Sequence, residues 1–171
     1  MSLEKIALAG GCFWGTERYF QLLRGVRETT VGYANGPTDH APSYEEVKHG
    51  LGHAETVMIT FDPDEITLSE LLEQYYTIID PFSVNRQGHD EGIQYRTGIY
   101  YLTDEQRETV EMSMNRLEAR LGRKTAIEVM KLACFYPAEE YHQDYLIKNP
   151  NGYCHLSASH FEEAKAFGRS K

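Results

Sequence analysis

The chain has 171 residues, of which 41% are hydrophobic and 25% are charged, and its formal net charge at pH 7 is −9. This length is enough for a single domain over residues 1–171 with its own core, and the acidic balance argues against nucleic acid or an anionic membrane surface as a partner. No apolar run approaches the roughly 18 residues of a membrane span, and the first residues lack the pattern of a secretory signal. We therefore expect a cytoplasmic protein.

The first half of the chain predicts three strands and one helix. The apolar run at 5–10, KIALAG, ends in a pair of glycines and is typical of a buried strand. A helix is expected to begin at Phe13 and to stop near Gly25. The stretches at 30–36 and 54–61 are expected to be strands, because each is apolar and runs into turn residues.

The second half predicts two capped helices. Residues 66–80 carry an apolar face, and Thr67 with Glu70 three residues later is a capping box. The short strand at 98–102 leads directly into a polar helix at 104–121, which begins with a similar box. Both helices follow strands closely, as expected when helices cover one sheet.

The last third predicts one more strand at 126–135, a short helix at 138–148 and a C-terminal tail at 149–171. Strands interleaved with helices indicate an α+β fold, an α/β sandwich in which helices flank a mixed sheet. We expect a ferredoxin-like core and a coil-rich tail.

The three cysteines, Cys12, Cys134 and Cys154, are too few and too far apart for a disulfide scaffold or a CxxC zinc site. Cys12 stands at the predicted junction of strand and helix, where unpaired backbone N–H groups and the helix dipole favour a thiolate. Position alone supports a nucleophile and a buried structural cysteine about equally. Phe13 and Trp14 are expected to form an apolar wall beside it that suits a methyl group, although two core aromatics would give the same pattern.

The segment GCFWG at 11–15 resembles the signature of the peptide methionine sulfoxide reductase A family. Four further segments resemble that family in its order, so that the resemblance extends from residue 6 to about 155. They are PSYEEV at 42–47, GHAETV at 52–57, NRQGHDEGIQYRT at 85–97 and FYPAEEYHQDY at 135–145.

The resemblance implies that Cys12 is the catalytic cysteine and that Phe13 and Trp14 hold the S-methyl group of the substrate. It also implies that Glu55 supplies a proton to the sulfoxide oxygen. A glutamate can do this only if burial raises its pKa above the ordinary value of about 4.3. A solvated carboxylate at the end of a strand is the alternative for Glu55.

Tyr44 and Tyr95 match two phenols that hydrogen-bond the sulfoxide oxygen in the family, and Asp90 matches a carboxylate that orients the substrate. Tyrosines suit this task because they are neutral donors at pH 7. Without the resemblance, the two tyrosines would be assigned to packing and Asp90 to a turn.

Attack by Cys12 leaves a sulfenic acid, which condenses readily with a second thiol. Cys154 lies in the loop-like stretch NPNGYCHL, and the resemblance implies that it recycles Cys12 through a disulfide. Cys134, at the end of an apolar strand, is expected to be buried and inert.

The implied function is stereoselective reduction of the S epimer of methionine sulfoxide, free or in proteins, as repair after oxidative stress. The implied reductant is thioredoxin, and neither a bound cofactor nor a metal is needed. We expect a monomer.

Two other classes of enzyme remain open. Histidines are numerous enough for a metal site, but none shows a ligand spacing such as HExxH; the candidates are His40, His49, His53, His142 and His155. A cysteine hydrolase or acyl transferase could pair Cys12 with His142 as a base, but it would have no use for Cys154. A pure binding module would explain neither the helix-terminal cysteine nor the proton donors.

Overall fold

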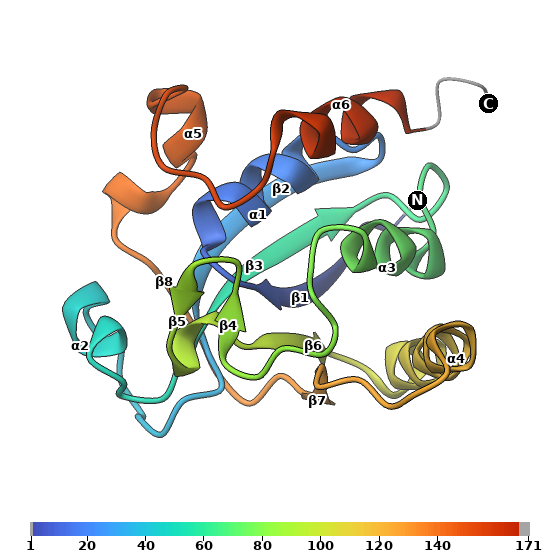
Figure 1. The fold of residues 1–171 in the computed structure, drawn as a ribbon, viewed down its shortest axis with the longest axis horizontal. Helices are drawn as coiled ribbons and strands as arrows, with labels where there is room; N and C mark the ends of the chain where they lie inside the picture. Colours follow the sequence, from blue (N-terminus) through green and yellow to red (C-terminus); the bar gives the residue numbers. More distant parts are fainter. Residues whose placement is uncertain (1, 168–171) are drawn as a thin grey trace.

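Six strands form one sheet in the computed structural model, which describes residues 2–167 (Figure 1). They are β1 (Glu4–Gly10), β2 (Val26–Ala34), β3 (Ala54–Phe61), β6 (Thr97–Tyr101), β7 (Glu128–Lys131) and β8 (Phe135–Pro137). Their order is β7-β6-β1-β3-β2-β8, and every pair is antiparallel except β6 with β7. A separate hairpin consists of β4 (Arg86–Gln87) and β5 (Asp90–Glu91).

The helices connect these strands. They are α1 (Phe13–Gln21), α2 (Tyr44–Lys48), α3 (Leu68–Tyr76), α4 (Asp104–Leu121), α5 (Tyr145–Lys148) and α6 (Ala158–Ala166), with 3-10 turns η1 (Ile93–Tyr95) and η2 (Glu140–His142). With α1 between β1 and β2 and α3 between β3 and β6, the inner four strands form a ferredoxin-like core. The predicted fold class is therefore confirmed. Within residues 2–167, no helix is long and apolar enough to cross a bilayer.

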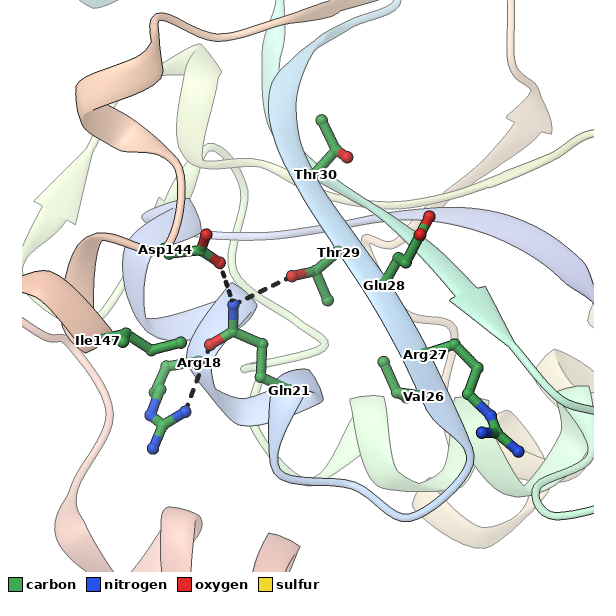
Figure 2. Close-up of a pocket in the computed structure, with 9 residues that line it drawn as sticks. All are labelled: Arg18, Gln21, Val26, Arg27, Glu28, Thr29, Thr30, Asp144 and Ile147. Atoms are coloured by element: carbon green, nitrogen blue, oxygen red, sulfur yellow. Dashed lines mark hydrogen bonds between the residues drawn. The ribbon is translucent and has the colours of Figure 1, made fainter.

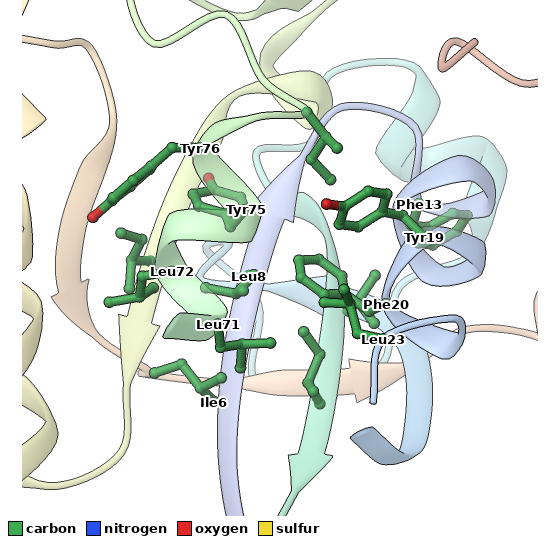
Figure 3. Close-up of a cluster of buried hydrophobic side chains, with 14 of the residues drawn as sticks. Ile6, Leu8, Phe13, Tyr19, Phe20, Leu23, Leu71, Leu72, Tyr75 and Tyr76 are labelled. Carbon is green, nitrogen blue, oxygen red and sulfur yellow. The ribbon is translucent and has the colours of Figure 1, made fainter. Parts of the chain in front are cut away.

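Strand β1 is buried on both faces, which explains its continuous apolar sequence. Ile6 and Leu8 point into the main core against α1 and α3 (Figure 3), whereas Ala7 and Ala9 belong to a small cluster on the opposite face. Successive side chains of a strand alternate between faces, so one short strand supplies both layers. Cys12 therefore follows the end of a strand that is packed against side chains on both faces of the sheet.

Local signals predicted the starts of α3 and α4 correctly. The Thr67 hydroxyl accepts the Glu70 N–H at 3.1 Å, and the Thr67 N–H donates to the Glu70 carboxylate at 3.0 Å, which completes the predicted capping box. The helix predicted at 104–121 has these bounds in the structure, but its predicted box is only half formed. The Thr103 hydroxyl accepts the Gln106 N–H at 3.1 Å, whereas the Gln106 side chain accepts the Leu102 N–H. Such boxes satisfy backbone groups that the first helical turn leaves unpaired.

The single strand predicted at 126–135 is wrong, because the segment divides into β7 and β8 at opposite edges of the sheet. Between them the chain crosses the end of the sheet. Oδ1 of Asn35 accepts the N–H groups of Ala133 at 2.7 Å and Cys134 at 3.3 Å. A side chain about a hundred positions away thus replaces the strand pairing that the apolar pattern suggested.

The continuous helix predicted at 138–148 is also wrong, since η2 and α5 are separated at Gln143 and Asp144. The Gln143 amide hydrogen-bonds both backbone groups of Val31, at 2.9 Å each, and so extends the edge pairing of β2. Asp144 has a φ of +54°, which a helix does not tolerate. Pairing with the sheet edge interrupts the helix here.

Candidate active site

Cys12 is the residue that caps α1, directly after β1. Gly11 makes the turn between them with a φ of +89°, a conformation that favours glycine. The Thr16 hydroxyl lies 3.2 Å from the carbonyl oxygens of both Gly10 and Cys12 and fixes the turn to the first turn of the helix. Cys12 is only 5% exposed, so its thiol lies in a nearly dry site.

Glu55 lies on β3, the strand that pairs with β1, and is 1% exposed. Its Oε1 accepts the backbone N–H of Phe13 at 3.2 Å. Burial, helped by the charge of Asp90, raises the pKa of Glu55 to about 8 against the lowering effect of that hydrogen bond. Glu55 is therefore protonated at neutral pH and stands beside the start of the helix that begins at Cys12.

The pKa of Cys12 is also raised well above its ordinary value. Burial is the main cause, followed by the charge of Glu55, while a hydrogen bond from the Trp14 N–H lowers it. The helix start favours the thiolate through the Trp14 N–H, as expected, but desolvation outweighs this effect in the free protein. At rest the site holds two protons, one on Cys12 and one on Glu55.

Tyr44 and Tyr95 are half-buried and approach this pair from α2 and η1. Burial raises the pKa of each phenol, and the charges of Glu55 and Cys12 raise it further, which places both rings near the two acids. Within the described part of the chain, neither hydroxyl has a hydrogen-bond partner. Two neutral donors are therefore free to bind an acceptor beside Cys12.

Asp90 joins the site from β5 and connects it to the C-terminal tail. Its Oδ1 accepts the hydroxyl of Tyr153 at 2.9 Å, while its Oδ2 is buried and has no partner among residues 2–167. The charge of Asp90 raises the pKa of Cys12, Glu55 and Tyr95, so all of these groups share one environment. The structure thus brings together the acids and phenols that the resemblance singled out.

Cys154 lies over α1, one helical turn beyond Cys12. A Cβ atom placed on Gly15 would lie 2.8 Å from the Cys154 sulfur, so only glycine leaves room for it. Residues three apart share a face of a helix, and Cys154 accordingly also raises the pKa of Cys12. Cys134 lies elsewhere, with its sulfur 3.9 Å from the carbonyl oxygen of Gly36, and it is half-buried rather than buried as predicted.

The two aromatics after Cys12 occupy different environments. Phe13 is buried, with its ring centroid 5.8 Å from that of Tyr33 and 5.3 Å from that of His142. Trp14 is half-buried and stacks on Tyr145 at 3.8 Å and 10°. Its indole N–H donates to Nδ1 of His142 at 3.0 Å. Both rings contact His142, and we call Phe13 and Trp14 together the wall.

The profile of the family described as peptide methionine sulfoxide reductase matches residues 4–170. The chain belongs to this family. It is 54% identical to a peptide methionine sulfoxide reductase MsrA of Lachnoclostridium phytofermentans, over 95% of this chain and 98% of that protein. Among solved structures, it resembles reduced Mxr1 of Saccharomyces cerevisiae with a TM-score of 0.84 and 37% identity, over 89% of this chain and 88% of the other. Mxr1 in complex with Trx2 matches with a TM-score of 0.60 and 28% identity, over 84% of each chain.

His142 contacts both aromatics of the wall, a placement that no sequence pattern indicates. His142 is fully buried, and burial lowers its pKa, so it is neutral. Its ring also lies 4.4 Å from that of Tyr44, between the wall and the phenol. The sequence singled out His142 only as a metal candidate, as a base in the hydrolase alternative and as part of a family segment.

This placement of His142 also disfavours the hydrolase alternative. A hydrolase needs a histidine nitrogen that accepts the proton of Cys12, but Nδ1 of His142 is occupied by Trp14. Within residues 2–167, no group of three or more His, Cys, Asp or Glu side chains is placed to hold a metal ion.

A network behind the wall holds Tyr145 in place. The buried carboxylate of Glu17 accepts the backbone N–H of Asp144 and the hydroxyl of Thr29, both at 2.9 Å. Gln21 also donates to Asp144, at 2.8 Å, beside a cavity of about 440 Å³ that is lined by neither Cys12 nor Glu55 (Figure 2). Helix α1 thus carries Cys12 at its start and, further along, anchors the segment that precedes Tyr145.

Proposed function

We propose that this protein reduces the S epimer of methionine sulfoxide, free or within proteins, to methionine through Cys12 and Cys154. The observation that carries the proposal is the buried carboxyl of Glu55, which accepts the Phe13 N–H at the start of the helix that Cys12 caps. Sulfoxide oxygen is a poor leaving group unless it is protonated as the sulfur is attacked, so this chemistry needs an acid in a dry site.

In the first half-reaction the Cys12 sulfur attacks the sulfoxide sulfur. Glu55 transfers its proton to the sulfoxide oxygen, while Tyr44 and Tyr95 hydrogen-bond that oxygen. The thiol proton of Cys12 restores the proton that Glu55 gave up. The hydroxyl then passes from the substrate sulfur to the Cys12 sulfur as the bond between the two sulfurs breaks. Methionine leaves, and Cys12 becomes a sulfenic acid, so that Cys12 supplies both electrons.

The remaining residues orient the substrate. Phe13 and Trp14 hold the S-methyl group, and the buried Oδ2 of Asp90 provides a free acceptor at the edge of the site. A methyl wall on one side and oxygen-directed donors on another accept only one arrangement around a pyramidal sulfur in line with Cys12. This argument favours the S epimer, in agreement with the family resemblance.

In the second half-reaction the thiol of Cys154 displaces the hydroxyl of the sulfenic acid, which forms a disulfide and water. We propose a thioredoxin as the external reductant, since the related Mxr1 has been crystallised with Trx2. A cleft of about 310 Å³ opens beside Cys154, between Ile147 and Phe161, and offers a dithiol a route to its sulfur. The protein would thereby repair oxidised methionine without a bound cofactor.

A single turnover without external reductant tests this proposal. Fully reduced protein is mixed with excess S-epimer methionine sulfoxide, and methionine and free thiols are counted. We expect about one methionine per chain, a fall from the three free thiols to one, and a disulfide between Cys12 and Cys154. The R epimer is the control and should yield no methionine. Survival of all three thiols with no methionine formed would overturn the proposal.

A further inference from the structure

We propose that His155 is the proton acceptor for Cys154 when this thiol attacks the sulfenic acid of Cys12. The inference rests on the proposed function and adds a residue to its second half-reaction. The observations that carry it are the protonation pattern of the imidazole and its position beside the recycling sulfur.

The contacts of His155 leave one ring nitrogen as a free base. Its Nε2 lies 3.1 Å from the carbonyl oxygen of Gly10. A carbonyl oxygen only accepts hydrogen bonds, so Nε2 carries the hydrogen and Nδ1 carries the lone pair. Nδ1 is buried and has no hydrogen-bond partner in the part of the chain that the structure describes.

Nδ1 of His155 and the Cys154 sulfur both lie against Gly15 of α1. A Cβ atom on Gly15 would lie 2.8 Å from the Cys154 sulfur and 3.2 Å from Nδ1 of His155. The Cys154 sulfur and Nδ1 of His155 are therefore no farther apart than these two distances added together. At rest the sulfur accepts the Leu156 N–H at 3.4 Å, and the thiol does not hydrogen-bond Nδ1, which has no partner among the described residues. The imidazole therefore engages the thiol when Cys154 turns toward Cys12.

The charges around the pair suit proton transfer at neutral pH. Burial raises the pKa of Cys154, which keeps its thiol protonated, and burial lowers the pKa of His155, which keeps its imidazole neutral. The groups that face His155 are Asp90 of β5, which raises its pKa, and His160 of α6, which lowers it. A thiol that does not ionise by itself therefore lies next to a base that is not yet protonated.

The step balances without any further reagent. The thiol proton of Cys154 moves to Nδ1 of His155, and the Cys154 sulfur bonds to the Cys12 sulfur. The S–O bond of the sulfenic acid breaks, and its hydroxide takes the proton from Nδ1 and leaves as water. Cys154 is oxidised, Cys12 is reduced from sulfenic acid to disulfide, and His155 is regenerated.

The test separates the two half-reactions in His155→Gln. The glutamine amide can still donate to the Gly10 carbonyl, but it is not a base. Methionine formation and thiol loss are followed in one turnover with the S epimer. We expect methionine formation to keep its rate and disulfide formation at pH 7 to slow by about 10²-fold, a typical effect of losing a general base. The defect should shrink at higher pH, where Cys154 ionises by itself, and added imidazole should restore part of the rate.

Two controls accompany this variant. His49→Gln changes an exposed histidine at the end of α2 and should alter neither phase. In the unmodified protein, the rate of disulfide formation should fall as the pH drops below the pKa of His155, because a protonated imidazole cannot accept the thiol proton. This measurement does not require any variant to fold. A His155→Gln protein that forms the disulfide at the unmodified rate, or that is equally slow at every pH without rescue by imidazole, would overturn the inference.

Hydrogen peroxide as the oxidant allows the role of His155 to be tested separately from the reduction of methionine sulfoxide. Peroxide converts the Cys12 thiol to the sulfenic acid and water, so disulfide formation can be followed without any sulfoxide. Failure to reduce methionine sulfoxide, with disulfide formation after peroxide still dependent on His155, would overturn the proposed function and support the inference. A disulfide rate that is independent of His155 after peroxide would overturn the inference alone.

Discussion

The two cysteines of the proposed cycle are held in different ways. Cys12 follows a central strand paired on both sides, and its partner Glu55 lies on the next strand, so both have fixed and almost fully buried positions. Cys154 lies in coil between α5 and α6, is half-buried, and its segment is tied down by single hydrogen bonds from its neighbours Tyr153 and His155. The acid chemistry of the first step requires a dry site that does not move, whereas the second step requires a thiol that leaves its resting place.

This comparison predicts that the two half-reactions can be broken separately. Substitutions of Cys12 and of the residues of β1 and β3 that surround it should change methionine formation. Substitutions where the tail meets α1 should change only disulfide formation and steady-state turnover. The following predictions run from the largest expected effect on rate to the smallest.

Cys12→Ser should reduce methionine formation to the uncatalysed background. A serine hydroxyl cannot give two electrons to the sulfoxide, so no later step can begin. The measurement is methionine release in a single turnover with the S epimer. Cys134→Ser is the matched control and should keep full activity, because Cys134 lies away from the site. Appreciable methionine release by Cys12→Ser would contradict the assignment of the nucleophile.

Glu55→Gln should slow methionine formation by about 10² to 10³-fold, the range expected when a general acid is lost. Glutamine keeps the shape of the side chain and can accept the Phe13 N–H, but it has no proton to give. Rapid-quench measurement of the first turnover shows the effect. Glu108→Gln, at an exposed position of α4, is the control with an expected rate equal to that of the unmodified protein. A rate for Glu55→Gln within twofold of normal would argue for a different acid.

Gly15→Ala should act on the second region alone. The added methyl group would lie 2.8 Å from the Cys154 sulfur and displace it, and such overpacking costs about 1–3 kcal/mol, equivalent to roughly 5- to 150-fold in rate. We expect one methionine per chain at the normal rate and slower disulfide formation. In a Cys154→Ser background the same substitution should have no further effect on methionine formation. A loss of methionine formation in that background would place Gly15 in the first half-reaction instead.

The buried Glu55 should also make stability depend on pH. Its pKa is about 8 in the folded protein and near 4.3 when unfolded, so the folded state binds the extra proton between these values. The contribution of Glu55 to the free energy of unfolding should therefore fall as the pH rises from 5 to 8, by at most about 1.4 kcal/mol per pH unit. Glu17, with a pKa of about 7, acts in the same direction up to that pH.

Urea unfolding at pH 5 and pH 8 measures this dependence. Glu55→Gln should flatten it, and Glu17→Gln should flatten it less. An unchanged pH dependence in Glu55→Gln would show that Glu55 is not buried as a protonated acid.

Local sequence patterns predicted the elements that depend on neighbours along the chain. The strand at 54–61 and the helix at 104–121 have the predicted bounds, because apolar alternation and the cap at Thr103 decide them. The breaks near Cys134 and Gln143 were missed because amide side chains hydrogen-bond backbone about a hundred residues away. No periodicity in the sequence encodes such contacts.

The candidate site likewise has features that the sequence predicted and features that it did not. The family segments pointed to Cys12, Glu55 and Asp90, whose charges the structure brings within range of one another. The direction of the Cys12 pKa shift was missed, since it depends on burial by segments that meet only in the folded protein. The free nitrogen of His155 was missed as well, because its role depends on which backbone carbonyl the ring contacts.

The most direct test of the division between the two regions is a single turnover of Cys154→Ser. Reduced protein with its two remaining thiols is mixed with S-epimer methionine sulfoxide, methionine release is timed, and the Cys12 sulfenic acid is trapped with a dimedone-type reagent. The account predicts one methionine per chain at the unmodified rate, a trapped sulfenic acid on Cys12, and no disulfide. Methionine release that slows in step with the loss of the disulfide would contradict it, because the first half-reaction would then depend on the tail.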